Sequence, residues 1–184
     1  MFLPRPSEER SRKRVALAEL YEAHFERVAR YIAVRIGNAD EAEDLAAEVF
    51  VRALRSVDSY KETGAPMEAW VFRIAHNILV DHLRARGRRP APMPLEDAPP
   101  VASADNPTTQ MERQEEAQAL RRAMEQLTDA QRRVLALRFG GEMTSEQVAQ
   151  VLKKSPGAVR EMQSAAIRRL RQVMEDEQQR PGSS

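Results

Sequence analysis

The stretch that decides the fold is TSEQVAQVLKKSPGAVREMQSAAIRRLR, which runs from Thr144 to Arg171. A threonine with glutamine three residues later is a capping box, and it predicts that a short helix begins after Thr144. Ser155 before Pro156 predicts a second helix, because proline suits the first helical position after a cap residue. Lys153 and Lys154 fall in the turn between the two helices. A short capped helix, a tight turn and a longer helix form a helix-turn-helix.

The longer helix carries an apolar face and a cationic face. With about 100° per residue, its packing side consists of Val159, Met162, Ala166, Leu170 and Val173. The opposite side consists of Arg160, Ser164, Arg168 and Arg171, flanked by Glu161 and Gln172. A recognition helix places N-terminal side chains at base edges and cations near phosphates. A solvated arginine face of a bundle helix is the alternative, and the repeated capping signals favour the DNA-binding interpretation.

The segment 111–176 is predicted to be a four-helix domain that ends in this helix-turn-helix. A helix is expected over 111–126, and Thr128 with Gln131 forms a second capping box before the next helix. Gly140 and Gly141 are expected to end that helix. The last residues, 177–184, are predicted to be a flexible tail.

The segment 90–110, PAPMPLEDAPPVASADNPTTQ, predicts a flexible linker. It contains six prolines, no Lys or Arg, and the acids Glu96, Asp97 and Asp105. Repeated loss of the N–H donor and the lack of an apolar face exclude a packed helix. Fully extended, such a linker reaches roughly 65 Å. The helical segments on either side are small, so a deep substrate cavity is not expected.

The segment 15–89 is predicted to be an N-terminal helical bundle, with 1–14 flexible in front of it. The first helix is expected over 15–36, and Asn38 is expected to cap a second helix that runs to about Val57. The second helix is expected to bury Leu45, Val49, Phe50, Ala53 and Leu54. Its other side carries acids, namely Asp40, Glu41, Asp44 and Glu48. These acids lie opposite the apolar side and lack the Glu-x-x-His spacing of carboxylate metal sites, so we expect no metal. They either favour the helix macrodipole or dock a basic protein.

A third helix is expected in AWVFRIAHNILVDHLRARGRR, residues 69–89. One side of this helix is apolar, and the other carries Arg73, Asn77, Asp81 and Arg84. Arginine and asparagine can contact bases through two hydrogen bonds each. The cations at the helix end, which include Arg88, also suit the macrodipole. That alternative does not account for Asn77 in the same line, so we favour nucleic-acid binding.

Composition and motifs exclude several classes of function. The chain has 184 residues, a formal net charge of +1 and no cysteine, which excludes disulfides and thiolate sites. No apolar run approaches the roughly 20 residues of a membrane span, and no secretory signal core precedes the first helix. No catalytic triad, phosphate loop or helical metalloprotease motif is present. We therefore expect a cytoplasmic, non-enzymatic protein without cofactors, metals or membrane insertion.

Three segments together resemble the bacterial RNA polymerase sigma factors of the extracytoplasmic-function (ECF) group. DEAEDLAAEVFVRAL is similar to the helix that docks on a coiled coil of the largest polymerase subunit. MEAWVFRIAHNILVDHLR is similar to the helix that reads and melts the minus-ten promoter element. LTDAQRRVLALRFGGEMTSEQVAQVLKKSPGAVREMQSAAIRRLR is similar to the domain that reads the minus-thirty-five element. The order and spacing of the three segments agree with the two-domain family pattern.

The resemblance implies a role for three sets of residues. The expected polymerase-docking set is Asp40, Glu41, Asp44 and Glu48. The expected minus-ten set is Ser59, Tyr60, Lys61, Arg73, Asn77, Asp81, Arg84 and Arg88, with the loop 59–67 holding a flipped base. The expected minus-thirty-five set is Lys153, Lys154, Arg160, Glu161, Gln163, Ser164 and Arg168. Lys153-Lys154, Ala158 and Arg160-Glu161-Met162 depart from the family pattern, which bears on base preference.

The implied partners are core RNA polymerase, promoter DNA and an anti-sigma factor. On the polymerase, the resemblance implies contacts with the largest-subunit coiled coil and with the flap of the second-largest subunit. Two other classes fit the residues. A free-standing helix-turn-helix regulator predicts operator binding without polymerase, and a helical protein-binding scaffold predicts no salt-dependent DNA affinity.

Overall fold

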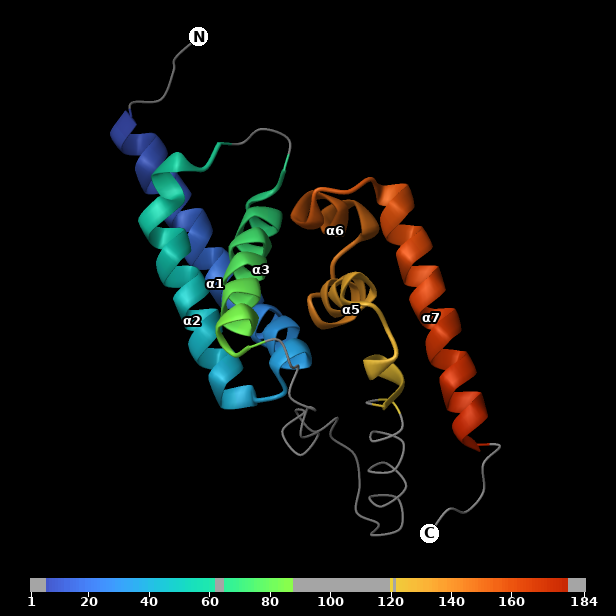
Figure 1. Cartoon of the computed structure of the whole chain (residues 1–184). Helices are drawn as coiled ribbons and strands as arrows, with labels where there is room; N and C mark the ends of the chain where they lie inside the picture. Colours follow the sequence, from blue (N-terminus) through green and yellow to red (C-terminus); the bar gives the residue numbers. More distant parts are fainter. Residues whose placement is uncertain (1–5, 62–64, 88–119, 121, 179–184) are drawn as a thin grey trace, which may run out of the picture.

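The structure is a computed structural model that describes residues 6–61, 65–87, 120 and 122–178. Every secondary-structure element in these ranges is helical, so the all-α prediction is confirmed. The predicted linker at 90–110, the start of the helix expected from residue 111, and Arg88 lie outside the described residues. Figure 1 shows α1, α2 and α3 on one side of the molecule and α5, α6 and α7 on the other.

The N-terminal half consists of α1 (Pro6–Ile36), α2 (Ala39–Ser56), the 3-10 turn η1 (Val57–Ser59) and α3 (Met67–Ala85). The boundary between α1 and α2 agrees with its prediction. Gly37 has a φ of 75°, a left-handed conformation that suits glycine. Asn38 then accepts a hydrogen bond from the backbone N–H of Glu41 at 3.0 Å, which satisfies one free donor of α2.

Two expectations for this half are wrong. The segment 1–14 was expected to be flexible, but α1 already begins at Pro6, and Arg10 Nε lies 3.1 Å from Asp58 Oδ2. The helical period continues through these charged residues because they face solvent, where little apolar burial is needed. Leu54 was expected in the core, but 50% of it is exposed. It lies on the rim of the apolar face of α2, beyond the contact with α1 and α3.

The C-terminal half consists of α5 (Asp129–Leu135), the π-helical turn η3 (Ala136–Gly140), α6 (Ser145–Leu152) and α7 (Pro156–Gln178). Both predicted capping boxes are present, at Thr128 and at Thr144. Ser155 Oγ accepts the N–H of Ala158 at 3.1 Å and so caps α7. Of the helix expected over 111–126, Leu120 and residues 122–125 are described and are helical.

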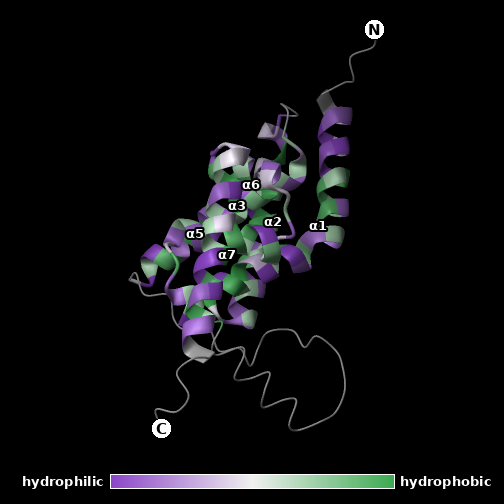
Figure 2. Ribbon diagram, turned by 90° about the vertical axis from the view of Figure 1, so that its right-hand side faces the viewer, coloured by the Kyte–Doolittle hydropathy of each residue, from purple (hydrophilic) through white to green (hydrophobic). Residues whose placement is uncertain are grey.

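The two halves share one hydrophobic core. A single cluster of buried residues joins Tyr31, Phe72 and Leu79 of the N-terminal half with Leu137 and Met143 of the C-terminal half. Helix α1 packs on η3, and α3 packs on α6. Figure 2 shows hydrophobic stretches of ribbon in the middle of the molecule, where the helices meet. A Cβ on Gly140 would lie 3.2 Å from the Cα of Tyr31, so glycine permits the close approach of η3 to α1. We call the contact of α1 and α3 with η3, α6 and the turn at Gly141–Glu142 the interdomain interface.

Candidate nucleic-acid and protein interfaces

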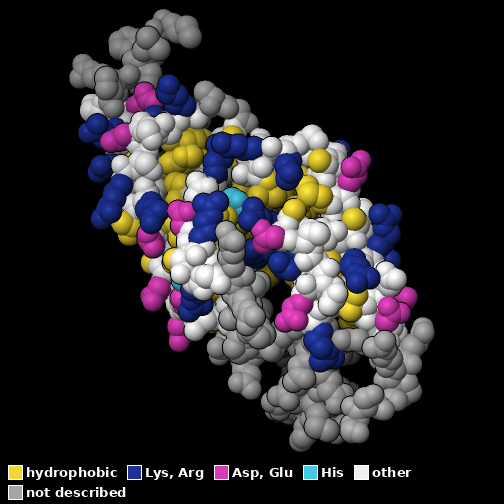
Figure 3. All heavy atoms as spheres, in the orientation of Figure 1, with side chains coloured by type: hydrophobic (Ala, Val, Ile, Leu, Met, Phe, Trp, Pro, Cys, Tyr) yellow, Lys and Arg dark blue, Asp and Glu magenta, His cyan; other side chains and the backbone are white. Residues whose placement is uncertain are grey.

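Helix α7 presents the cationic face that its sequence predicts. Val159 and Ala166 are buried, whereas Arg160, Ser164 and Arg168 are exposed together with Glu161. Figure 3 shows Lys and Arg side chains on the side of the molecule where α7 lies. The second member of the helix-turn-helix is therefore open to a partner along one line, as a recognition helix must be.

Two of the predicted minus-thirty-five residues contact other side chains of the same protein. Arg160 Nη1 lies 3.1 Å from Oε1 of Glu146 in α6, with both side chains exposed. Gln163 is half-buried and accepts a hydrogen bond from Arg138 Nε at 2.9 Å. To make a bidentate contact with a base, Arg160 would have to give up its ion pair with Glu146. Because that pair is exposed on the surface, breaking it costs little free energy. Gln163 is held more firmly, because this hydrogen bond joins α7 to Arg138 of η3.

The turn of the helix-turn-helix contains a left-handed lysine. Lys153 has φ 53° and ψ 50°, and its N–H caps α6 by bonding to the carbonyl of Ala149. The N–H of Lys154 bonds to the same carbonyl at 2.9 Å. Both lysines are exposed. The conformation at Lys153 is the one that glycine adopts at helix C-termini at little cost, so the lysine occupies a mildly strained position.

Helix α3 presents three of its four predicted polar residues to solvent. Asn77, Asp81 and Arg84 are exposed, and Arg84 Nη1 lies 3.7 Å from Asp81 Oδ1. Arg73 is half-buried instead, and its Nη2 donates to the carbonyl oxygen of Gln150 at 2.9 Å. The line predicted from the sequence exists on the helix, but its first member contacts α6 across the interdomain interface.

The loop before α3 is organised by Tyr60. Its ring is 6% exposed and packs 5.3 Å from the ring of Trp70, centroid to centroid. Its hydroxyl donates to the carbonyl of Ala65 at 2.9 Å, which ties the two ends of the loop together. Ser59 and Lys61 are exposed, and residues 62–64 lie outside the described residues. Tyr60 therefore shapes the loop in this structure, and its ring is not accessible to a base.

The outer face of α2 combines acids with apolar side chains. Asp40 and Asp44 are exposed, and Glu48 forms an ion pair with Arg52 one turn away. Among these charges lie Val51 and Leu54, which are 46% and 50% exposed. Our sequence reading missed this apolar centre because it assigned Leu54 to the core. The signal that could have revealed it is Val51, an apolar residue on the polar side of the helical wheel.

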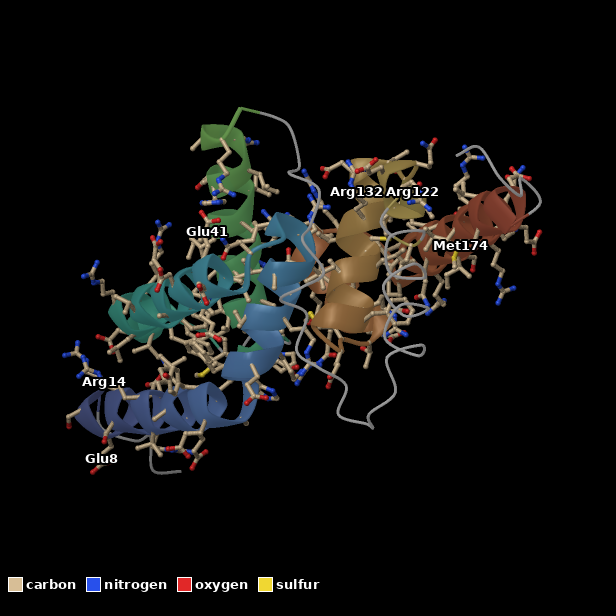
Figure 4. The ribbon with its side chains drawn as sticks, turned by 90° about the horizontal axis from the view of Figure 1, so that it is seen from below. Glu8, Arg14, Glu41, Arg122, Arg132 and Met174 are labelled. Carbon is tan, nitrogen blue, oxygen red and sulfur yellow. The ribbon has the colours of Figure 1, made fainter. Side chains whose placement is uncertain are left out.

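Glu41 differs from the other acids of α2. Its carboxylate lies 2.9 Å from Nη2 of Arg86 and 3.3 Å from Nε2 of His82, both at the end of α3. Figure 4 shows Glu41 between the start of α2 and α3. Its contacts join two helices of the N-terminal half, so its described role is structural.

A cluster of charged groups from α5 surrounds the end of α1, beside the interdomain interface. Asp129 Oδ1 lies 2.7 Å from Arg35 Nη2, and Arg133 pairs with the same carboxylate. Burial would raise the pKa of Asp129, but the hydrogen bond and charge of Arg35 outweigh it and lower this pKa. Burial, followed by repulsion from Arg133 and Arg35, lowers the pKa of His76 to about 4. His76 Nδ1 lies 3.1 Å from the hydroxyl oxygen of Tyr31, and we expect this histidine to be neutral at pH 7.

Two other kinds of feature, a metal centre and a membrane-spanning helix, are absent from the described residues. In these ranges no group of three or more His, Cys, Asp or Glu side chains is arranged to hold a metal ion. None of the described helices has the length and apolar character required to cross a membrane.

Comparisons with known proteins identify two family regions in this chain. Residues 20–89 match the Sigma-70 region 2 family model, and residues 123–172 match the Sigma-70, region 4 model. The chain is 38% identical over 136 residues to the ECF RNA polymerase sigma factor ShbA of Streptomyces griseus, covering 72% of this chain and 71% of that protein. The chain belongs to the ECF RNA polymerase sigma factors. It is a non-enzymatic protein that directs RNA polymerase in promoter recognition.

Two further relatives belong to the same group, and two solved structures share the fold of this sigma factor. It is 32% identical to SigD of Mycobacterium tuberculosis, over 86% of this chain and 76% of that one. It is 30% identical to BldN of Streptomyces coelicolor, over 88% of this chain and 61% of BldN. CnrH in complex with the cytosolic domain of CnrY aligns with a TM-score of 0.64 and 22% identity, over 93% of this chain and 95% of that one. RpoE in complex with the anti-sigma factor NepR from Bartonella quintana aligns with a TM-score of 0.65 and 19% identity, over 86% of this chain and 96% of that one.

Proposed function

We propose that α7 of this sigma factor reads the minus-thirty-five element in the major groove. The observation that carries this proposal is the exposed line of Arg160, Ser164 and Arg168 behind a capped helix-turn-helix. Arg160 is close enough to the N-terminus of α7 to reach a base edge, where arginine pairs with guanine through two hydrogen bonds. Glu161 accepts from cytosine, and Lys153 and Lys154 contact phosphates on the flank of the groove.

The minus-ten element is assigned to α3. Asn77, Asp81 and Arg84 form an exposed line, and Arg73 extends that line once its contact with Gln150 is released. A base flipped from the stack costs a few kcal/mol, and the loop fixed by Tyr60 at its base offers the place to hold it. Ser59 and Lys61 at the start of this loop are the described residues that can contact the strand.

Polymerase docking is assigned to the outer face of α2. Asp40, Asp44 and Glu48 supply negative charge, which steers association with a basic partner. Val51 and Leu54 supply the apolar contact at its centre, and burial of such side chains contributes about 25 cal/mol per Å². This combination of an apolar centre with a charged rim is the usual anatomy of a protein interface.

Other partners follow from the family. The C-terminal half would contact the flap of the second-largest polymerase subunit, and the acidic segment 90–110 would run through the basic channel of the polymerase. The complexes of CnrH with CnrY and of RpoE with NepR support an anti-sigma partner for this chain as well. These partners place its action in the cytoplasm.

A base-by-base test of α7 examines the proposal directly. Holoenzyme with Arg160→Ala is compared with wild type on promoters randomised across the minus-thirty-five element. We expect a loss of about 1–3 kcal/mol in binding and relaxed preference at one base position. Arg169→Ala is the matched control, because Arg169 is exposed on the same helix but points away from this line. A uniform loss on all sequences would reassign Arg160 to a phosphate contact.

A further inference from the structure

The first turns of α1 carry a group of cations that none of the assigned promoter contacts uses. Arg10, Lys13 and Arg14 form this group, which we call the α1 basic patch. We propose that the α1 basic patch binds phosphates of the single DNA strand next to the base that the loop 59–67 holds. This inference rests on the proposed assignment of that loop and of α3 to the minus-ten element, and it adds α1 to the DNA surface of the N-terminal half.

The three side chains of the patch lie on one side of α1. Because an α-helix turns by about 100° per residue, Arg10, Lys13 and Arg14 fall within an arc of about 100°. Arg12 falls on the opposite side of the helix. Figure 4 shows Arg14 on the side of α1 that faces α2, and Glu8 on the other side. The patch is therefore one cationic surface rather than a ring of charges around the helix.

The patch lies beside the start of the loop. Arg10 Nε lies 3.1 Å from Asp58 Oδ2, and Asp58 belongs to η1, where it directly precedes Ser59. Helix α1 packs on η1. Figure 1 shows the start of α1 beside the end of α2, where the chain enters the loop before α3. A strand with one base held in the loop therefore passes close to the patch.

The ion pair of Arg10 competes only weakly with DNA. The Arg10 and Asp58 side chains are 62% and 42% exposed, and ion pairs this open to solvent contribute little. A phosphate can accept two hydrogen bonds from one guanidinium group, so Arg10 can exchange Asp58 for a phosphate. In the free protein, Asp58 holds Arg10 next to the loop.

The charges of the patch are not arranged to stabilise the free helix. Arg10 and Arg14 are four residues apart, a spacing at which like charges destabilise a helix. Lys13 pairs with Glu9 at 2.8 Å, but Arg14 is exposed and has no ion-pair partner among the described residues. Figure 3 shows Lys and Arg side chains along the side of the molecule where α1 begins. This positive charge indicates an anionic partner, and the adjacent loop favours DNA over an acidic protein.

Binding of phosphates by the patch is independent of base sequence. Proteins hold single strands with cations that follow the backbone, and each phosphate contact on a single strand contributes about 0.7 to the slope of log affinity against log salt concentration. Extruding a base costs free energy, and contacts with the neighbouring phosphates offset part of that cost. The patch therefore stabilises the melted strand, and its removal should have little effect on the binding of intact duplex.

Substitutions on the two sides of α1 test the patch. The double variant Arg10→Gln with Arg14→Gln removes both arginines of the patch. The single variants Arg14→Gln and Arg12→Gln form a matched pair, because both arginines are exposed on the same helix but only Arg14 is on the side of the patch. The probes are single-stranded oligonucleotides with the minus-ten region of a promoter mapped by run-off transcription. They end at the element or extend beyond it at one end or the other, and fluorescence anisotropy measures their binding to holoenzyme.

We expect one of the two extensions to tighten binding by wild-type holoenzyme about 10-fold, and the double variant to lose this gain. The salt slope of the double variant on the extended strand should fall by about 1.4, because two phosphate contacts are lost. Arg14→Gln should account for about half of that change, and Arg12→Gln for none. An unchanged slope in the double variant, or equal changes in the two single variants, would overturn the proposal. Loss of core polymerase binding with strand binding intact would also overturn it, by assigning the patch to a protein partner.

Binding of oligo(dT) by the free protein separates this inference from the proposed function. Because the patch contacts phosphates alone, we expect the double variant to bind oligo(dT) at low salt several-fold more weakly than wild type. Patch-dependent binding of oligo(dT) without any preference for the promoter strand would contradict the assignment of α3 to the minus-ten element and uphold the patch. Equal binding of oligo(dT) by the wild type and the double variant would overturn the patch as a single-strand site.

Discussion

Lys153 should limit the stability of the protein while it contributes to promoter binding. Its φ of 53° and ψ of 50° place this lysine in the left-handed region at the end of α6, a region that glycine adopts more readily. A left-handed conformation costs an L-residue roughly 1–2 kcal/mol relative to glycine. Replacing the lysine by glycine removes this cost, but it also makes the unfolded chain more flexible, which offsets part of the stabilisation. For Lys153→Gly we therefore expect a net increase of about 0.5–1 kcal/mol in the free energy of unfolding.

The same substitution should weaken DNA binding. Each phosphate contact contributes about 0.9 to the slope of log affinity against log salt concentration, so losing the Lys153 contact should lower that slope by about 1. The assays are urea unfolding of the free protein and salt titration of holoenzyme on a promoter duplex. The predicted result is a protein that is more stable and binds promoter less tightly.

Lys154→Gly is the matched control for this prediction. Lys154 is exposed, carries the same charge and is adjacent in the chain, but its φ is not positive. Glycine there should lower stability by a few tenths of a kcal/mol or more, while the salt slope falls as for Lys153. Equal stability changes for the two variants would refute the strain argument. An unchanged salt slope for Lys153→Gly would remove this lysine from the DNA interface.

Three further predictions address the remaining faces and the buried histidine. Asp44→Arg with Glu48→Arg should weaken binding to core polymerase at least 10-fold by reversing the docking charge, and unchanged co-purification would contradict that assignment. Asn77→Ala should reduce promoter opening, followed by permanganate reactivity, more than it reduces polymerase binding; equal losses would indicate a structural role. Because the pKa of His76 is lowered to about 4 and that of an unfolded histidine is about 6.5, the unfolded state binds more protons between these values. The contribution of His76 to the free energy of unfolding should therefore be fully present above pH 6.5 and fall toward pH 4, as measured by urea unfolding at each pH. His76→Gln should remove this part of the dependence of stability on pH.

Local signals in the sequence were sufficient for the helix-turn-helix. The capping boxes at Thr128 and Thr144 and the Ser155-Pro156 start are all present. Each depends on hydrogen bonds within about four residues, so composition and spacing determine them with little influence from tertiary structure. The apolar and cationic faces of α7 follow from the same local periodicity.

Features that depend on long-range contacts were not predictable in this way. Arg73 looked identical to Asn77 as a member of one polar line, yet only a contact with Gln150, which is 77 residues away along the chain, makes it half-buried. Leu54 looked like a core residue because periodicity does not show where the neighbouring helices end. Arg27 carried no signal at all, since its partners Glu68 and Gly141 meet it only in the folded chain.

Run-off transcription with purified bacterial core polymerase tests the central claim most directly. Pooled genomic promoter fragments are transcribed with and without this protein, and the start sites of new transcripts are mapped. The account predicts new transcripts from defined sites that share sequences near minus ten and minus thirty-five. Absence of stimulation, together with salt-sensitive binding of duplex DNA by the protein alone, would contradict it.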